Sequence, residues 1–162
     1  MSNVVTKESV KPLSFSSPDF DNEKYNQVAV AANLMELSLV KQRYDMKPDG
    51  FWEAEAEPHK LKQQFLGKPS GHRLHEDSGV LVGGYAWKAE IKFGRKKLLK
   101  LDAEYMLVYD GLETCDPEYA KLYFNKIARF TSYPYFRALF ALSATNSSLA
   151  LDPLPSLNDR VD

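Results

Sequence analysis

The sequence predicts an α+β protein, with a four-stranded antiparallel sheet followed by C-terminal helices. Two stretches, 35–46 and 85–109, alternate apolar and polar residues, which is typical of strands with one covered face. Asp116 and Pro117 then give a helix-start signal, and apolar residues recur at helical spacing beyond them. Strands that precede helices along the chain favour segregated α+β packing over an alternating α/β fold.

The first part of the chain is expected to contain an arm, a short helix and a strand. Residues 1–20 are rich in Ser, Pro and Lys without periodicity, so we expect a flexible N-terminal arm. Tyr25 and Val28 recur at near-helical spacing, which predicts a short helix from about Asp21. The first strand follows over 35–46, and the turn at 48–50 ends it.

The middle of the chain gives weaker signals. In 51–57 a charge stands at every second position, which fits a half-exposed strand or an extended loop. The stretch 59–79 is polar and rich in glycine, so we interpret it as a long connection or insertion. It would lie within one domain spanning 21–157, with 158–162 as a short tail.

The clearest feature is a β-hairpin over 85–109. Apolar residues alternate with charged ones on both sides of Gly94, and Gly94 with its basic neighbours supplies the turn. One face of this hairpin is strongly aromatic. We expect that face to be core, including Tyr85, Ile91, Tyr105 and Leu107.

The C-terminal region is predicted to be helical on both sides of a turn at Tyr133-Pro134, and whether the first helix runs unbroken into it stays open. One face of the first helix is expected to carry Tyr119, Leu122, Tyr123, Ile127 and Phe130. Between Phe130 and Leu151 the only formal charge is Arg137. A helix that is apolar nearly all round must be covered nearly all round, so we expect a second subunit to supply part of the cover.

Composition argues against several classes of protein. The net charge of -1 gives no overall field toward nucleic acid or anionic lipid. No apolar run approaches the roughly 20 residues that span a bilayer, and no secretory signal opens the chain. One cysteine, Cys115, fits a reducing compartment, so a cytoplasmic protein is expected.

Catalytic and metal-binding patterns are also weak. Phosphate-binding glycine loops and nucleophile elbows are missing, so we expect neither an enzyme nor a cofactor. His59, His72 and His75 are better explained as solvated side chains than as metal ligands, because the spacing supplies no fourth ligand. Asp102 and Glu104 beside Lys100 fit an ordinary charged solvent face.

Aromatic residues provide the remaining functional signal. The chain holds two Trp, nine Tyr and nine Phe, most of which have a place in the predicted core. Phe51 and Trp52 differ, because they stand between a turn and an acidic stretch where no core periodicity requires them. Exposed aromatics of this kind suit the binding of extended apolar segments.

The C-terminal region resembles the SecB family of bacterial protein-export chaperones, and in particular the SecB-like chaperones found outside the export pathway. The matching residues are Tyr133-Pro134-Tyr135-Phe136-Arg137 and the Leu/Pro-rich stretch 149–155. The likeness extends more weakly upstream to about Leu34.

This resemblance implies an ATP-independent holdase that binds unfolded or newly made polypeptides in hydrophobic grooves, in protein export or for a dedicated client such as an antitoxin. It implies a homo-oligomer, a dimer of dimers in the best-known members. The client-binding residues would be Phe51, Trp52, Leu149, Leu151, Leu154 and Leu157. The oligomer interface would contain Tyr133, Tyr135, Phe136, Leu139, Phe140 and Leu142.

Two departures separate the chain from export-dedicated members, which are strongly acidic and in some cases end in a zinc-binding tail. This chain is near neutral and ends Asn158-Asp159-Arg160-Val161-Asp162, which argues against coupling to the translocase motor. Two other classes stay open. One is a binding module for an apolar ligand, or for nucleic acid through Arg95, Lys96 and Lys97, and the other is a purely structural assembly subunit.

Overall fold

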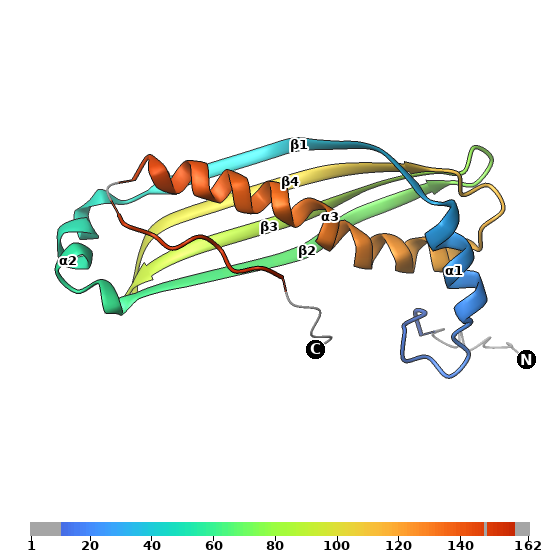
Figure 1. The fold of residues 1–162 in the computed structure, drawn as a ribbon, viewed down its shortest axis with the longest axis horizontal. Helices are drawn as coiled ribbons and strands as arrows, with labels where there is room; N and C mark the ends of the chain where they lie inside the picture. Colours follow the sequence, from blue (N-terminus) through green and yellow to red (C-terminus); the bar gives the residue numbers. More distant parts are fainter. Residues whose placement is uncertain (1–10, 148, 158–162) are drawn as a thin grey trace, which may run out of the picture.

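The protein consists of one antiparallel sheet with a long helix lying across one of its faces (Figure 1). The computed structural model describes residues 11–147 and 149–157. The elements in chain order are α1 (Asn22–Ala31), β1 (Asn33–Met46), η1 (Pro48–Gly50), α2 (Phe51–Ala56), η2 (Pro58–Lys60), β2 (Leu61–His75), β3 (Val80–Phe93), β4 (Lys96–Asp110) and α3 (Pro117–Thr145). The α+β arrangement with a four-stranded antiparallel sheet is as predicted.

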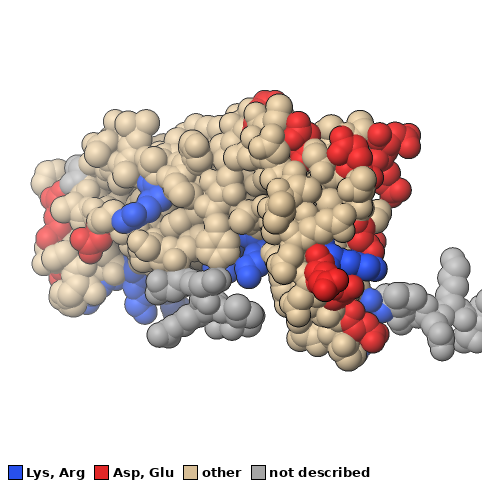
Figure 2. All heavy atoms as spheres, turned by 45° about the vertical axis from the view of Figure 1, so that its right-hand side comes forward, with Lys and Arg blue, Asp and Glu red and all other residues tan. Residues whose placement is uncertain are grey.

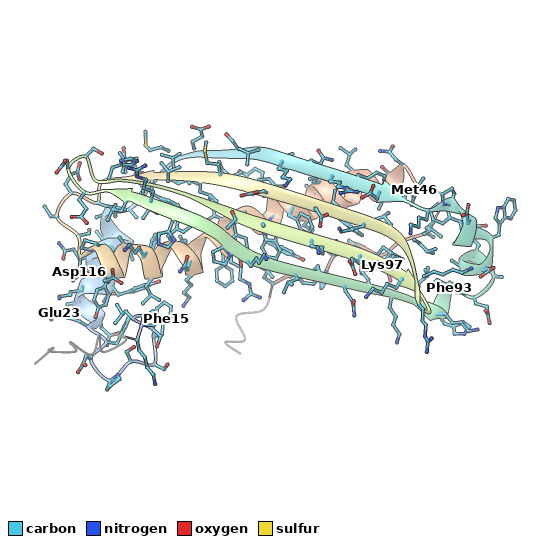
Figure 3. All side chains as sticks on the ribbon, turned by 180° about the vertical axis from the view of Figure 1, so that it is seen from behind. Phe15, Glu23, Met46, Phe93, Lys97 and Asp116 are labelled. Carbon is cyan, nitrogen blue, oxygen red and sulfur yellow. The ribbon has the colours of Figure 1, made fainter. Side chains whose placement is uncertain are left out.

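The sheet has the order β1-β4-β3-β2, so β1 and β2 are its edges. Residues such as Leu39, Tyr105 and Tyr85 lie in register across three strands, on the face that α3 covers. Among the described residues no helix lies on the opposite face, as the view from behind shows (Figure 3). One face is therefore dry and the other wet, as the alternation along the hairpin predicts.

The prediction for residues 51–79 is wrong in two respects. The stretch 59–79 is mostly a strand, since β2 pairs with β3 from Leu61 to His75. Its half-buried residues at 61, 63, 65 and 67 alternate with exposed ones, but an edge strand buries little, so the pattern is faint. The stretch 51–57 is a short helix, because Phe51 and Ala54, three residues apart, share its buried side.

The hairpin of β3 and β4 forms the centre of the sheet and confirms the prediction. Gly94 makes the turn with a φ of +60°, a conformation that favours glycine. The inner face holds the expected core residues Tyr85, Ile91, Tyr105 and Leu107, each at most 3% exposed. The sheet therefore offers a continuous aromatic and aliphatic surface to α3.

The predicted turn at Tyr133-Pro134 does not exist, because α3 runs unbroken from Pro117 to Thr145. Asp116 caps its start, where the carboxylate accepts a hydrogen bond from the Glu118 amide at 3.0 Å. Pro134 removes one helical hydrogen bond and crowds the preceding turn. The helix continues because Tyr133 and Phe136, on either side of the proline, are both buried against the sheet.

The buried side of α3 also differs from the predicted one. Of the predicted residues Tyr119 is buried, but Leu122, Tyr123, Ile127 and Phe130 are only half-buried. In the first half of the helix the fully buried positions are Ala120, Phe124 and Ala128. Small residues at two of these positions let the helix approach the sheet. Gly83 has the same effect from the strand side, since a Cβ there would lie 2.3 Å from the Phe124 ring.

A buried hydrogen bond fixes α3 over the middle of the sheet. The Trp87 indole on β3 donates to the Ser132 hydroxyl at 2.8 Å, and that hydroxyl donates to the Ala128 carbonyl at 2.6 Å. The Trp87 ring also stacks on Phe136, with centroids 5.6 Å apart. The pair therefore sets both the distance and the register of the helix on the sheet.

The expected N-terminal arm is folded in its second half, while residues 1–10 lie outside the described part of the chain. Phe15 packs edge-on against Tyr25 at 5.2 Å, and Phe20 lies 5.6 Å from Tyr119 of α3. The Lys126 ammonium stands 5.0 Å over the Phe15 ring. Aromatic contacts that no periodic pattern reveals thus hold residues 11–20 against α1 and α3.

Removal of the Ser132 hydroxyl should destabilise the protein by about 1–3 kcal/mol, because Ser132→Ala leaves the buried Trp87 indole N–H without a partner. The measurement is urea unfolding followed by tryptophan fluorescence. Ser143→Ala is the matched control, since that hydroxyl makes the same kind of bond to its own helix. Equal unfolding free energies for the two variants would contradict the role given to the Trp87 bond.

Candidate functional site

The C-terminal residues 149–157 form an extended segment beside α3, on the same face of the sheet (Figure 1). We call this segment the strap. It begins near α2 and runs between α3 and the edge strand β2, to both of which it is hydrogen-bonded. The strap and α3 together cover the inner face of the sheet.

Three side chains hold the strap, and we call them the strap site. Gln63 on β2 donates from Nε2 to the Asp152 carbonyl at 2.9 Å, and Arg137 on α3 donates from Nε to the Leu154 carbonyl at 2.7 Å. The Tyr133 hydroxyl donates to the Pro155 carbonyl. A short irregular segment is thus held from both sides, by β2 and by α3.

The electrostatics of the strap site keep its donors in donor form. Burial raises the pKa of the Tyr133 phenol, and Arg137 opposes part of that rise. A raised pKa means that the phenol retains its proton well above neutral pH, so it can donate to the Pro155 carbonyl. Arginine is charged at any ordinary pH, so the pair works over a wide pH range.

Leucines alternate with prolines and polar residues along the strap. Leu154 is fully buried in the main core, and Leu151 and Leu157 pack against that core half-buried. The residues between them, Asp152, Pro153, Pro155 and Ser156, are exposed. From Leu151 onward, every third residue therefore points inward.

A second, smaller cluster ties the start of the strap to α2. Leu149 packs with Phe51, Ala54 and Leu98 in this cluster, and all four are nearly buried. Trp52, the next residue on α2, is 83% exposed. At the α2 end, one large aromatic side chain is therefore exposed to solvent, next to a small cluster of buried apolar residues.

The structure separates the residues that the resemblance assigned to client binding. Phe51, Leu149 and Leu154 are buried within the chain, and Leu151 and Leu157 are half-buried. Only Trp52 is exposed in this conformation. Burial follows from the path of the strap across the sheet, so the leucines could contact a client only after the strap moves.

Of the residues predicted to form the oligomer interface, some are buried within the chain and others are exposed. Tyr133, Phe136 and Phe140 belong to the core of the chain, which corrects the expectation that they form a subunit surface. Their burial by the sheet supplies most of the cover that the charge-poor helix requires. Tyr135 and Leu142 are 56% and 64% exposed, and Leu139 is half-buried.

Large areas of the surface lack charge. Over the middle of the molecule, Figure 2 shows a broad uncharged area, with Asp and Glu at the two ends and most of them toward the α1 end. The edge strand β1 adds further exposed apolar side chains, which are Leu34, Met35, Leu39, Val40 and Met46. Exposed apolar residues on an unpaired strand edge are typical of interaction surfaces.

The basic cluster at the hairpin turn is partly neutralised. Lys97 lies 3.0 Å from Glu90, and Lys96 lies 3.5 Å from Glu53. A shallow hollow of about 380 Å³ on the uncovered sheet face mixes cations such as Lys41, Lys68 and Lys88 with Asp102 and Glu104. Neither surface gathers charge of one sign as strongly as a nucleic-acid interface does.

The described residues show neither a metal-binding cluster nor a helix that could span a membrane. Among residues 11–147 and 149–157, no group of three or more His, Cys, Asp or Glu side chains is placed to hold a metal ion. His72 instead packs against the Phe124 ring, with centroids 5.9 Å apart. In that part of the chain, none of the helices has both the length and the apolar character needed to cross a membrane.

A long helix on a four-stranded antiparallel sheet, followed by an extended C-terminal segment, defines the class of fold. This chain is similar in structure to the SecB-like chaperone Rv1957 of Mycobacterium tuberculosis, solved with a ChAD peptide from the HigA1 antitoxin Rv1956. The two structures match with a TM-score of 0.65 and 19% sequence identity, over 86% of this chain and 99% of that one. The chain therefore has a SecB-like fold, as its sequence resemblance implies.

The second structural match is weak, and the sequence comparisons found no match. A protein of unknown function from Streptococcus agalactiae is similar over 78% of this chain and 96% of its own at 13% identity, but a TM-score of 0.33 supports no argument. No sequence-family model matches the chain, and no curated protein is similar to it in sequence.

The sequence did not reveal the strap site. Gln63 lies in a stretch interpreted as a connection. Tyr133 and Arg137 belong to the motif that carries the family resemblance, but no pattern in the sequence indicated a contact between either of them and the strap. One signal was present, since leucine recurs at 151, 154 and 157 around two prolines. That spacing fits an extended segment with one buried side.

Loss of the Arg137 donor should loosen the strap. Arg137→Met removes the hydrogen bond to the Leu154 carbonyl, worth about 1–2 kcal/mol, so a protease should cleave the strap about five- to thirty-fold faster. Limited proteolysis with mass spectrometry measures this. Arg129→Met, an exposed position on the same helix, is the control, and equal cleavage of both variants would show that Arg137 does not hold the strap.

Proposed function

We propose that the protein is an ATP-independent molecular chaperone of the holdase type, which binds extended, unfolded polypeptide and keeps it from aggregating. One observation carries the proposal. A SecB-like sheet and helix already hold an extended, leucine- and proline-rich segment between α3 and β2. A surface that binds one extended apolar segment has the chemistry to bind another.

The selectivity of such a chaperone follows from burial. Apolar contact contributes about 25 cal/mol per Å², so binding strengthens with the length of apolar chain that the client exposes. Native proteins have already buried that surface. The protein therefore distinguishes unfolded from folded chains without any specific sequence.

Trp52 is the proposed first contact for a client. It is 83% exposed, and it follows Phe51, which packs with Leu149 at the start of the strap. A large exposed aromatic contributes much contact area at low entropic cost, and tryptophan is enriched at binding hot spots. The antitoxin peptide bound to Rv1957 supports a dedicated client of that class, and the proposed setting is the cytoplasm.

The proposal includes a homo-oligomer, with a dimer of dimers as the expected form. Two surfaces of the chain support it. The α3 face with Tyr135 and Leu142 is apolar and exposed, and the β1 edge leaves its outer hydrogen-bonding groups without a neighbouring strand. Burial of both surfaces by other copies would cover them and extend the sheet.

The purified protein should suppress aggregation of a chemically denatured substrate at stoichiometric ratio, as measured by light scattering. Trp52→Ala should weaken client binding about ten-fold, equivalent to about 1.4 kcal/mol. Glu55→Ala, exposed on the same short helix, is the matched control. Failure of the wild type would refute the holdase, and an unchanged Trp52→Ala would remove only that residue from the site.

Two charges on the exposed face of α3 should dissociate the assembly. Tyr135→Glu with Leu142→Glu places charges where the proposed interface is dry, so the mass should fall toward the 18.4 kDa of one chain. Light scattering coupled to size exclusion measures this. Asn125→Glu, also exposed on α3, should leave the mass unchanged, and a monomeric wild type would rule out the assembly.

A further inference from the structure

The strap makes a single kind of hydrogen bond with the strap site. Each of its three hydrogen bonds to the strap site runs from a side-chain donor of Gln63, Tyr133 or Arg137 to a main-chain carbonyl of the strap. The carbonyls belong to residues 152, 154 and 155. In these contacts the strap supplies only acceptors and the strap site only donors.

This pattern accepts any extended chain, including one with prolines. Every residue has a main-chain carbonyl, whereas proline has no N–H to donate. Two of the strap's own residues, Pro153 and Pro155, are prolines, and both are exposed. A segment that adds to the edge of a sheet must donate main-chain N–H groups to the edge strand. A proline-containing segment lacks some of these donors, so a sheet edge would bind it poorly, whereas the strap site needs only its carbonyls.

Side-chain selection comes from the apolar positions. Leu151, Leu154 and Leu157 face the core, three residues apart, and Leu154 is fully buried. Proline and the residue before it both favour extended, polyproline-like backbone, in which every third side chain lies on the same side. The segment that fits is therefore extended, with apolar residues at every third position and tolerance for proline between them.

We propose that the strap is a built-in competitor of the client. It occupies the strap site in the resting chain, and a client segment with apolar residues at every third position binds there after the strap leaves. This proposal rests on the chaperone function proposed above and specifies the class of segment and the regulation of that site.

Tethering gives the strap an advantage over any free peptide. It is joined to the end of α3 by a few residues, and short tethers correspond to effective concentrations in the millimolar range. The apparent affinity of a client falls by the fraction of chains whose site is open. Short accidental segments are thus excluded, and long unfolded chains that also contact Trp52 can displace the strap.

A peptide with the strap sequence, LALDPLPSL, tests the proposal when labelled with fluorescein and titrated with the full-length protein. Leu154→Ser weakens the strap but leaves the strap site unchanged, so it should bind the peptide at least ten-fold more tightly than the wild type does. Ser156→Ala, exposed on the strap, is the matched control and should bind like the wild type. Adding Arg137→Met to Leu154→Ser should abolish the gain.

A folded Leu154→Ser variant that binds the peptide no more tightly than the wild type would overturn the proposal. If that variant does not fold, Leu157→Ser takes its place, because Leu157 packs against the core only half-buried and its loss weakens the strap at a smaller cost to the fold. Tighter peptide binding by the folded Leu157→Ser variant than by the wild type supports displacement of the strap. Equal binding by the two forms overturns it.

The aggregation assay separates this proposal from the chaperone function. A wild type that suppresses aggregation, together with no gain in Leu154→Ser, would leave the holdase standing and remove the competitor. Tight peptide binding by Leu154→Ser without aggregation suppression by either form would remove the holdase and leave a peptide-binding site closed by the strap.

Discussion

The close packing of α3 on the sheet is the constraint on which the rest of the structure depends. Gly83 and Ala120 allow the approach, and the Trp87 indole bonded to Ser132 fixes the position of the helix. Because the helix lies where it does, Tyr133 and Arg137 face the strip of sheet next to β2. A shift along the helix by one residue would rotate both donors away from the strap.

The strap then completes a core that the sheet and helix leave unfinished. Leu154 fills a position in the main core, and Leu149 joins the cluster formed by Phe51 at α2. A segment with no secondary structure of its own, held by a few side-chain contacts, opens at lower free energy than a strand or helix does. The strap can therefore cover this face of the sheet in the resting chain and still be replaced there by another segment.

The proposed function and the stability of the chain depend on the same apolar residues. The leucines that resemble client-binding positions in the SecB family contribute to the resting core, while Trp52 and the exposed side of α3 remain at the surface. Exposed apolar surface lowers the solubility of a protein unless another molecule covers that surface. Assembly and client binding are two ways to cover it, which is why both belong to one proposal.

The sequence by itself determined the elements with strong local patterns, which are α1, β1, the β3–β4 hairpin and the start of α3 at Asp116. Periodicity and capping act over a few residues, so they can be recognised without the fold. Only the tertiary structure decided that Leu61–His75 is an edge strand, that α3 continues through Pro134, and that Leu154 is core. An edge strand buries too little to show a clear alternation, and flanking burial outweighs the cost of a proline. The role of a leucine in an extended segment depends on the distant side chains, here Gln63 and Arg137, between which the fold places it.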